Sequence, residues 1–292
     1  MAWEYEGLFD AIPNSGDMLH TFWTKEETEI RAGCMGYRTQ TTKAGPRLEA
    51  EIYPLFGREK TGRLRAAKKN ETPERQRKQN EIRAKRRLIL LMEENFRVWE
   101  DLHVTLTWAG EEPTEKVFRR AVSSFFRKVR KIRAERKLEE LKYLYAIGYD
   151  ADHRIHAHVI LNSGIGRDEL ESIWGRGISN ALRLQDYGGG IQGMANYLYR
   201  QREQIKKTPQ GAGLRSWAGS RNLRKPKVHT SDSKFSNQKV KKIAYNFQNE
   251  AKTILEKTYP GYVLQDCRVC YSDVVDGVYI RCVMRRWEEV ER

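Results

Sequence analysis

The stretch Arg154-Ile-His-Ala-His-Val-Ile-Leu161 decides the fold and much of the chemistry of this chain. Its apolar residues predict a buried strand, and residues two apart in a strand point to the same face. His156 and His158 are therefore expected to share one face, while Ala157 and Val159 turn into the core. Neutral imidazoles suit divalent metals, so the pair predicts a metal site. Because the chain has six histidines among 292 residues, a chance pair is the competing interpretation.

Neighbouring stretches extend this strand into a sheet. Residues 143–149 and the histidine strand flank the short turn 150–153, an arrangement typical of a β-hairpin. Residues 102–108, Leu-His-Val-Thr-Leu-Thr-Trp, alternate apolar and polar side chains like a half-buried strand. For residues 99–228 we expect a small antiparallel sheet with helices on one face, which is an α+β class of fold.

The amino-terminal region, residues 1–98, is expected to be a basic extension. Residues 29–39 and 47–53 predict a strand hairpin, and Thr72-Pro73-Glu74 marks the start of a basic helix. That helix ends in the apolar run 88–92, which predicts a core-facing surface.

The carboxyl-terminal region, residues 229–292, predicts a helix at about 237–257 that is stopped by Pro260-Gly261. A hairpin is expected around Asp276-Gly277. Its strands are similar in length to those of the amino-terminal hairpin, which gives the hypothesis that the two pack in a second sheet.

Residues 191–205 have the periodicity of a helix with one buried face. The expected buried residues are Ile191, Met194, Ala195, Leu198 and Ile205. Tyr197 then shares the polar flank with Arg200, Gln201 and Gln204. Tyr199 lies roughly 200° away from Tyr197 around the helix, so both cannot face one site. We choose Tyr197, with Tyr199 as the alternative and simple helix packing of both as the competing interpretation.

A net charge of +15 and a pI near 9.6 indicate attraction to polyanions, with salt-dependent binding. The basic residues concentrate at 58–87, 119–131 and 221–227, although those at 119–131 also fit the solvated face of a helix. The candidate DNA-binding residues are Arg63, Arg65, Lys68, Lys69, Arg83, Lys85, Arg86, Arg87, Arg127, Lys128, Arg221, Arg224 and Lys225.

Residues 102–108, 154–161 and 197–200 resemble, in chain order, the three motifs of the HUH endonucleases, the family of rolling-circle replication initiators and relaxases. The resemblance runs from about residue 102 to 226. It implies an RRM-like or ferredoxin-like arrangement of helices on a central antiparallel sheet, with α/β extensions at both ends. It also implies that His156 and His158 hold Mg²⁺ or Mn²⁺.

In that family a tyrosine attacks a DNA phosphate and leaves a 5′-phosphotyrosyl strand with a free 3′-hydroxyl. The family pattern is Tyr-x-x-Lys. Arg200 occupies the lysine position for Tyr197, where its charge would stabilise a phenolate or phosphate. Arg202 has the same spacing from Tyr199, so the spacing alone leaves both tyrosines open.

The chain departs from the family at one position. Many relatives carry a metal-binding Glu eight residues before the first histidine, where this chain has Gly148. We rank Asp150 first as a substitute, because its parity along the strand matches that of Gly148. The alternatives are Asp152, His153, Glu49, Glu51 and water.

The resemblance implies an enzyme that starts rolling-circle replication of a phage, plasmid or integrative element on single-stranded or hairpin origin DNA. No Walker motif accompanies it, so a host helicase and polymerase are the expected partners. The alternatives are a non-catalytic basic nucleic-acid-binding protein, and a relaxase or transposase with the same chemistry. The tyrosine follows the histidines in the chain, and this order favours replication.

A signal peptide and a long apolar segment are both missing from the pattern, so we expect a cytoplasmic protein of a bacterial host without a membrane partner. Cys267-Arg-Val-Cys270 resembles half of a zinc or redox motif, but a single pair is weak, and free structural thiols are the preferred interpretation.

Overall fold

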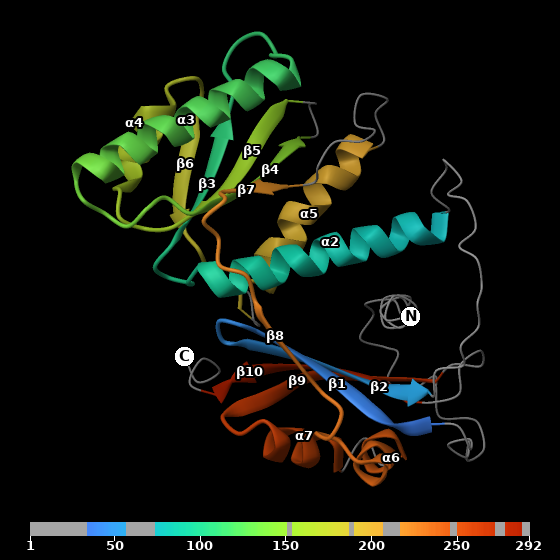
Figure 1. Cartoon of the computed structure of the whole chain (residues 1–292). Helices are drawn as coiled ribbons and strands as arrows, with labels where there is room; N and C mark the ends of the chain where they lie inside the picture. The colour runs from blue at the N-terminus through green and yellow to red at the C-terminus, as the bar shows by residue number, and fades with distance from the viewer. Residues whose placement is uncertain are drawn as a thin grey trace. The chain divides into compact units, whose positions relative to one another are not determined.

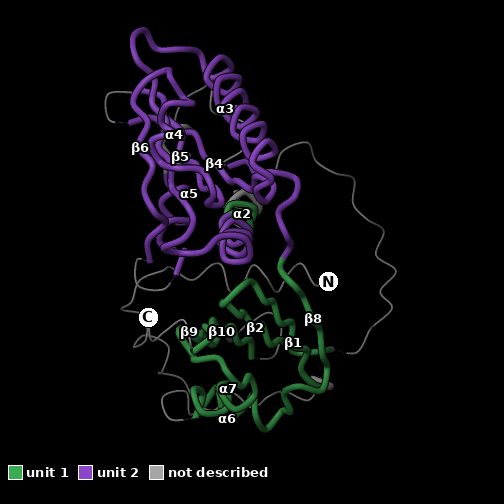
Figure 2. The backbone as a smooth tube through the Cα atoms, turned by 90° about the vertical axis from the view of Figure 1, so that its left-hand side faces the viewer, with its two compact units in different colours: residues 1–84, 226–292 green, residues 85–225 purple. Residues whose placement is uncertain are grey.

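A computed structural model describes residues 34–56, 74–150, 154–186, 190–206, 217–245, 250–271 and 278–287 (Figure 1). The chain divides into two compact units (Figure 2). Unit 1 consists of residues 1–84 and 226–292, and unit 2 consists of residues 85–225. The sequence had suggested three regions with boundaries near 98 and 228, whereas the structure joins the two flanks in one unit.

Unit 1 contains a five-stranded antiparallel sheet with the order β8-β1-β2-β10-β9. The strands are β1 (Cys34–Ala44), β2 (Arg47–Phe56), β8 (Lys227–Ser231), β9 (Tyr262–Tyr271) and β10 (Val278–Arg286). Because β10 pairs with β2, the carboxyl-terminal hairpin and the amino-terminal hairpin belong to the same sheet. Their apolar faces, with Leu48 and Ile280 fully buried, form one core with residues of α6 and α7.

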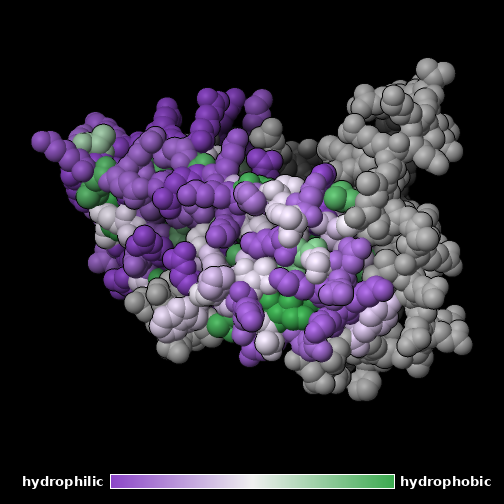
Figure 3. Space-filling view, turned by 60° about the horizontal axis from the view of Figure 1, so that its bottom comes forward, coloured by the Kyte–Doolittle hydropathy of each residue, from purple (hydrophilic) through white to green (hydrophobic). Residues whose placement is uncertain are grey.

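The expected helix at 237–257 is two helices, α6 (Asn237–Tyr245) and α7 (Lys252–Thr258). Val240 and Ile243 of α6 and Leu255 of α7 are fully buried in the unit 1 core. The surface seen in Figure 3 is mainly hydrophilic, with apolar residues in small separate groups. Single exposed apolar residues are normal on a protein surface.

Unit 2 contains the second antiparallel sheet, with the order β6-β3-β5-β4-β7. The strands are β3 (Leu102–Thr107), β4 (Tyr143–Tyr149), β5 (Ile155–Leu161), β6 (Ser179–Arg183) and β7 (Ala218–Gly219). The helices are α3 (Glu115–Glu135), α4 (Arg167–Trp174) and α5 (Gln192–Lys206). Helix α2 (Glu74–Asn95) starts at the predicted residue, and its apolar run Leu88–Met92 is buried.

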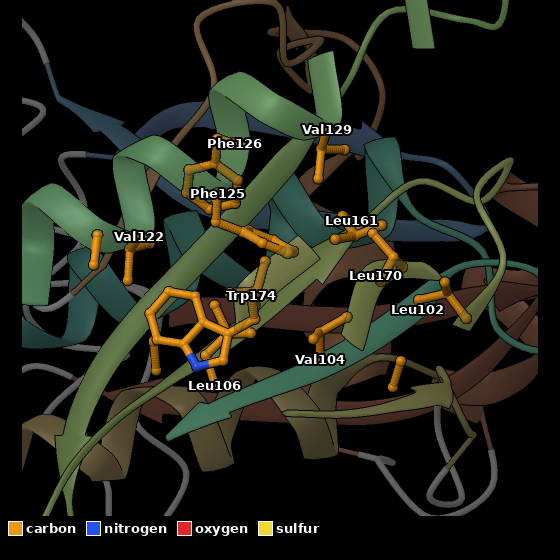
Figure 4. Close-up of a cluster of buried hydrophobic side chains, with 14 of the residues drawn as sticks. Leu102, Val104, Leu106, Val122, Phe125, Phe126, Val129, Leu161, Leu170 and Trp174 are labelled. Carbon is orange, nitrogen blue, oxygen red and sulfur yellow. The ribbon is translucent and has the colours of Figure 1, made fainter. Parts of the chain in front are cut away.

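The core of unit 2 lies between one face of this sheet and helices α3 and α4 (Figure 4). Thr114 caps α3 by accepting a hydrogen bond from the Val117 amide. The buried residues of α3 recur every three or four positions, as an amphipathic helix requires. Trp174 at the end of α4 packs edge-on against Phe118 and Phe125. Its indole nitrogen donates to the Thr107 carbonyl, which ties α4 to β3.

The fold is α+β with antiparallel sheets, as the sequence predicted. One detail differs, because helices cover both faces of the unit 2 sheet: α5 lies across from α3 and α4 (Figure 1). The reason is the buried stripe of α5, in which Met194, Ala195 and Leu198 need an apolar partner. Within the part of the chain that the structure describes, none of the helices combines the length and hydropathy of a bilayer-spanning segment.

Candidate active site

The strand registers of unit 2 place both histidines on the sheet face opposite the α3 core. Residues paired directly across an antiparallel ladder share a face. Ile178 extends this grid, because its carbonyl accepts the Thr107 amide. From β6 to β4, the three rows on this face are Ile178, Thr107, His156, Gly148; Asn180, Thr105, His158, Ala146; and Leu182, His103, Ile160, Leu144.

Burial falls steadily across these rows from β4 to β6. The β4 and β5 members are buried, the β3 members are half-buried, and the β6 members are exposed. Ile178 is 77% exposed and Leu182 is 47% exposed, although both are large apolar side chains. We call Ile178, Asn180 and Leu182 the β6 shelf. The histidines therefore lie where the helix-covered half of the face meets an open half.

Helix α5 brings Tyr197 to the histidines. The Tyr197 hydroxyl lies 3.0 Å from Nε2 of His158, and the two rings meet edge-on. Tyr197 remains 42% exposed, so its hydroxyl is within reach of a molecule on the surface. Because the buried stripe of α5 faces the sheet, Tyr197 stands at the edge of the helix, as its periodicity predicted.

Tyr199 occupies a different environment on the same helix. Only 6% of it is exposed, so it packs in the interior. Arg200 is exposed and follows Tyr197 by three residues, which places the two side chains as neighbours on the helix surface. The structure thus brings Tyr197 to the histidine pair and encloses Tyr199.

The hydrogen bonds of both imidazoles involve Nδ1 on the side of the sheet. Nδ1 of His156 is 3.3 Å from the Arg154 carbonyl, which can only accept. Nδ1 of His158 is 3.1 Å from Nε2 of His103 and 3.3 Å from the Thr105 hydroxyl. His156 must therefore donate from Nδ1 in this contact, which puts its lone pair on Nε2.

Burial is the main reason that these imidazoles stay neutral. It lowers the pKa of His103 to about 4 and that of His158 to about 3, and the nearby charges of His103 and His156 lower the latter further. A neutral imidazole is the form that binds a metal.

The same shift makes His158 a weak base. Moving a proton from a phenol of pKa about 10 to an imidazole of pKa about 3 costs about 10 kcal/mol, at ~1.4 kcal/mol for each pKa unit. His158 alone therefore cannot activate Tyr197 effectively, and a nearby cation would have to favour the phenolate.

The acidic ligand of the family has no equivalent at the expected place. Gly148 lies directly across from His156 and contributes no side chain. Asp150 closes the β4–β5 turn, where its carboxylate accepts the Arg154 amide at 2.8 Å. Among the residues described, no cluster of three or more His, Cys, Asp or Glu side chains is arranged to hold a metal.

The other substitutes are distributed as follows. Asp152 and His153 fall outside the described residues. Glu49 and Glu51 belong to unit 1, where Glu49 is buried and accepts hydrogen bonds from Arg47 and Arg281. Two imidazoles that present Nε2 fit a divalent cation that also accepts oxygen ligands, with phosphate or water completing the shell.

The basic candidates lie in several places. Arg63, Arg65, Lys68 and Lys69 fall outside the described residues. Lys85, Arg86 and Arg87 lie on α2 with Arg83. Arg127 and Lys128 are exposed on α3, the helix that covers the opposite sheet face. Arg221, Arg224 and Lys225 follow β7, and Arg224 also donates to the Glu94 carbonyl.

The sequence did not single out His103 or Thr105, although both contact His158. The available signal was the alternation of residues 102–107, which puts both on the polar side of β3. Their position beside His158 depends on the pairing of β3 with β5, two strands almost fifty residues apart in the chain.

The cysteines Cys267, Cys270 and Cys282 are free thiols in unit 1. Cys267 lies across from Cys282, and Cys270 lies across from Tyr279, so the Cys267 and Cys270 side chains face opposite sides of β9. Burial raises the pKa of Cys270 to about 11 and that of Cys282 to about 12, which keeps these thiols protonated and unreactive.

A sequence model of a replication-associated protein family, the ORF2 type, matches residues 101–202. The matched span begins just before β3 and ends within α5, so it includes His156, His158 and Tyr197. This chain is similar to replication-associated proteins over that span, which supports its interpretation as a replication initiator. The comparison with curated proteins and the comparison with solved structures gave no significant match.

Proposed function

We propose that this chain is a metal-dependent endonuclease and strand transferase of the HUH type, which nicks single-stranded origin DNA to start rolling-circle replication. The observation that carries the proposal is the 3.0 Å contact between the Tyr197 hydroxyl and His158 Nε2, at the border of an open sheet face. The match to replication-associated proteins over residues 101–202 supports the same role.

In the proposed reaction the Tyr197 oxygen forms a bond to the scissile phosphorus as the bond from phosphorus to the 3′-oxygen breaks. The phenolic proton leaves to solvent or a base, and the departing 3′-oxygen takes up a proton. The products are a 5′-phosphotyrosyl strand and a 3′-hydroxyl, so the reverse reaction rejoins DNA without a nucleotide cofactor. His156 and His158 would hold Mg²⁺ or Mn²⁺, whose chemistry is Lewis-acid polarisation of the phosphate.

Single-stranded DNA is the proposed substrate because the site lies on a sheet surface with an exposed apolar margin. Ile178 and Leu182 of the β6 shelf offer contact area to unstacked bases, and Asn180 between them offers amide hydrogen bonds. Helix α5 covers the β4 side, so a strand would approach Tyr197 across β6 and β3. Arg200, exposed near Tyr197, is the proposed cation for the phosphate or phenolate.

The test uses single-stranded oligonucleotides that carry the origin of the replicon encoding the chain, with Mn²⁺ or Mg²⁺ present. Wild-type protein should form a covalent adduct that survives denaturing electrophoresis. Tyr197→Phe should form none while binding the same DNA, and Tyr199→Phe, the matched control on the same helix, should keep the adduct. An adduct that persists in Tyr197→Phe and disappears in Tyr199→Phe would transfer the role to Tyr199.

One observation favours a second candidate, a basic nucleic-acid-binding protein that does not cut. Gly148 stands where relatives carry a carboxylate, and the described residues hold no cluster of three ligands. That candidate predicts binding without any adduct at every metal tested. The double variant His156→Ala, His158→Ala separates the two, because an endonuclease loses nicking there while keeping most of its salt-sensitive affinity for DNA.

A further inference from the structure

A third imidazole touches His158 on the side away from Tyr197. His103 Nε2 is 3.1 Å from Nδ1 of His158, whereas the Tyr197 hydroxyl is 3.0 Å from its Nε2. The two nitrogens of an imidazole point to opposite sides of the ring. His103 therefore does not lie where it would share a cation with Nε2 of His158, and its contact is with the other nitrogen.

The contact at Nδ1 decides which nitrogen of His158 carries the proton. A neutral imidazole has one N–H and one lone pair, so a proton on Nδ1 leaves the lone pair on Nε2. In the opposite tautomer, Nε2 would carry the proton and face the Tyr197 oxygen as a donor. A phenol is a better donor than acceptor toward imidazole, which favours the first arrangement.

We propose that His103 is a positioning residue for His158, whose Nδ1–H it accepts at Nε2. This hydrogen bond fixes the tautomer that directs the Nε2 lone pair toward Tyr197, and the Thr105 hydroxyl at 3.3 Å provides a second acceptor. Partners of this kind orient ligand histidines in many metal sites. The inference rests on the proposed function for its purpose, but the tautomer can be measured without nicking.

The test compares the metal-free full chain, with ¹⁵N-labelled histidine, with three variants. Long-range ¹H–¹⁵N spectra report which nitrogen of His158 is protonated. Wild type should show protonation at Nδ1, and His103→Gln should keep it, because a glutamine amide oxygen can reach the same place. The double variant His103→Leu, Thr105→Val has no side-chain acceptor, so it should lose the Nδ1–H preference.

Mn²⁺ titration of the same samples gives the second measurement. The double variant should bind Mn²⁺ about 10- to 100-fold more weakly than wild type, as is typical when the partner of a ligand histidine is removed. His103→Gln should stay close to wild type. The control Val104→Ala removes a buried side chain from the opposite face of β3, and it should change stability but neither the tautomer nor the affinity.

Two results would overturn the positioning role. One is a wild-type spectrum with the His158 proton on Nε2. The other is a double variant that keeps both the Nδ1–H tautomer and the wild-type Mn²⁺ affinity. A wild-type protein that failed to nick DNA would refute the proposed function instead, and the tautomer measurement would still decide the role of His103.

Discussion

Acid should unfold unit 2 well before it protonates most carboxylates, because His103 and His158 are neutral inside the fold. Both pKa values are lowered, to about 4 and about 3, from an ordinary value near 6.5. Between pH 6.5 and 4 the unfolded chain therefore binds more protons than the folded chain. Stability that is present above pH 6.5 is lost as the pH falls through this window.

The magnitude follows from the same numbers. At pH 5 an unfolded histidine is almost fully protonated, whereas His158 and most of His103 remain neutral in the fold. Each residue then costs about 2 kcal/mol relative to pH 7, so the pair costs about 4 kcal/mol. With a urea dependence of ~2 kcal/mol per molar, the unfolding midpoint of unit 2 should fall by about 2 M.

The assay is urea unfolding of metal-free protein at pH 7 and pH 5, followed by hydrogen exchange in peptides from β3 and β5, which separates unit 2 from unit 1. The double variant His103→Gln, His158→Gln should lose most of the fall. His229→Gln, which removes an exposed histidine of β8 in unit 1, should keep it. A wild-type midpoint that is equal at both pH values, or a double variant that falls as far as wild type, would refute the reasoning.

Three further predictions concern the frame of the site. Gly177→Ala should lower the stability of unit 2 by about 1–3 kcal/mol, because the added Cβ would lie 2.5 Å from a β3 carbonyl oxygen; Gly166→Ala, with open space, should not, as thermal unfolding would show. Trp174→Ala should cost about 3–5 kcal/mol in urea unfolding through the lost α4 packing, and a smaller loss would contradict the central place of this ring in the core. Ile178→Ser should weaken binding of single-stranded DNA without changing its salt dependence in anisotropy titrations, whereas Val117→Ser on α3 should leave binding unchanged; equal effects of both would argue against the β6 shelf as the contact surface.

Local periodicity accounts for much of what the sequence predicted about the site. Alternation in residues 154–161 put both imidazoles on one face, and the helical period of residues 191–205 put Tyr197 on the edge of its helix and Tyr199 inside. These are short-range properties, because a side chain's direction in a strand or helix follows from its position within that element.

Long-range pairing accounts for what the sequence could not supply. His103 meets His158 only because β3 inserts between β6 and β5, an order that periodicity does not determine. The open β6 margin and the placement of α3 behind the sheet, which separates Arg127 from the histidine face, follow from the same order. The two-helix form of 237–258 is likewise a matter of packing on the unit 1 core.

The missing carboxylate has a consequence for the proposed chemistry. With Gly148 across from His156, the described part of the site offers two neutral imidazoles, and phosphate oxygens of the bound strand are the natural completion of a cation's shell. Each ligand then raises the affinity for the other by the same factor, because binding linkage is reciprocal. A cation held weakly by the protein alone would be held firmly when a strand lies across β3. The site would thus be completed at the moment when Tyr197 has a phosphate to attack.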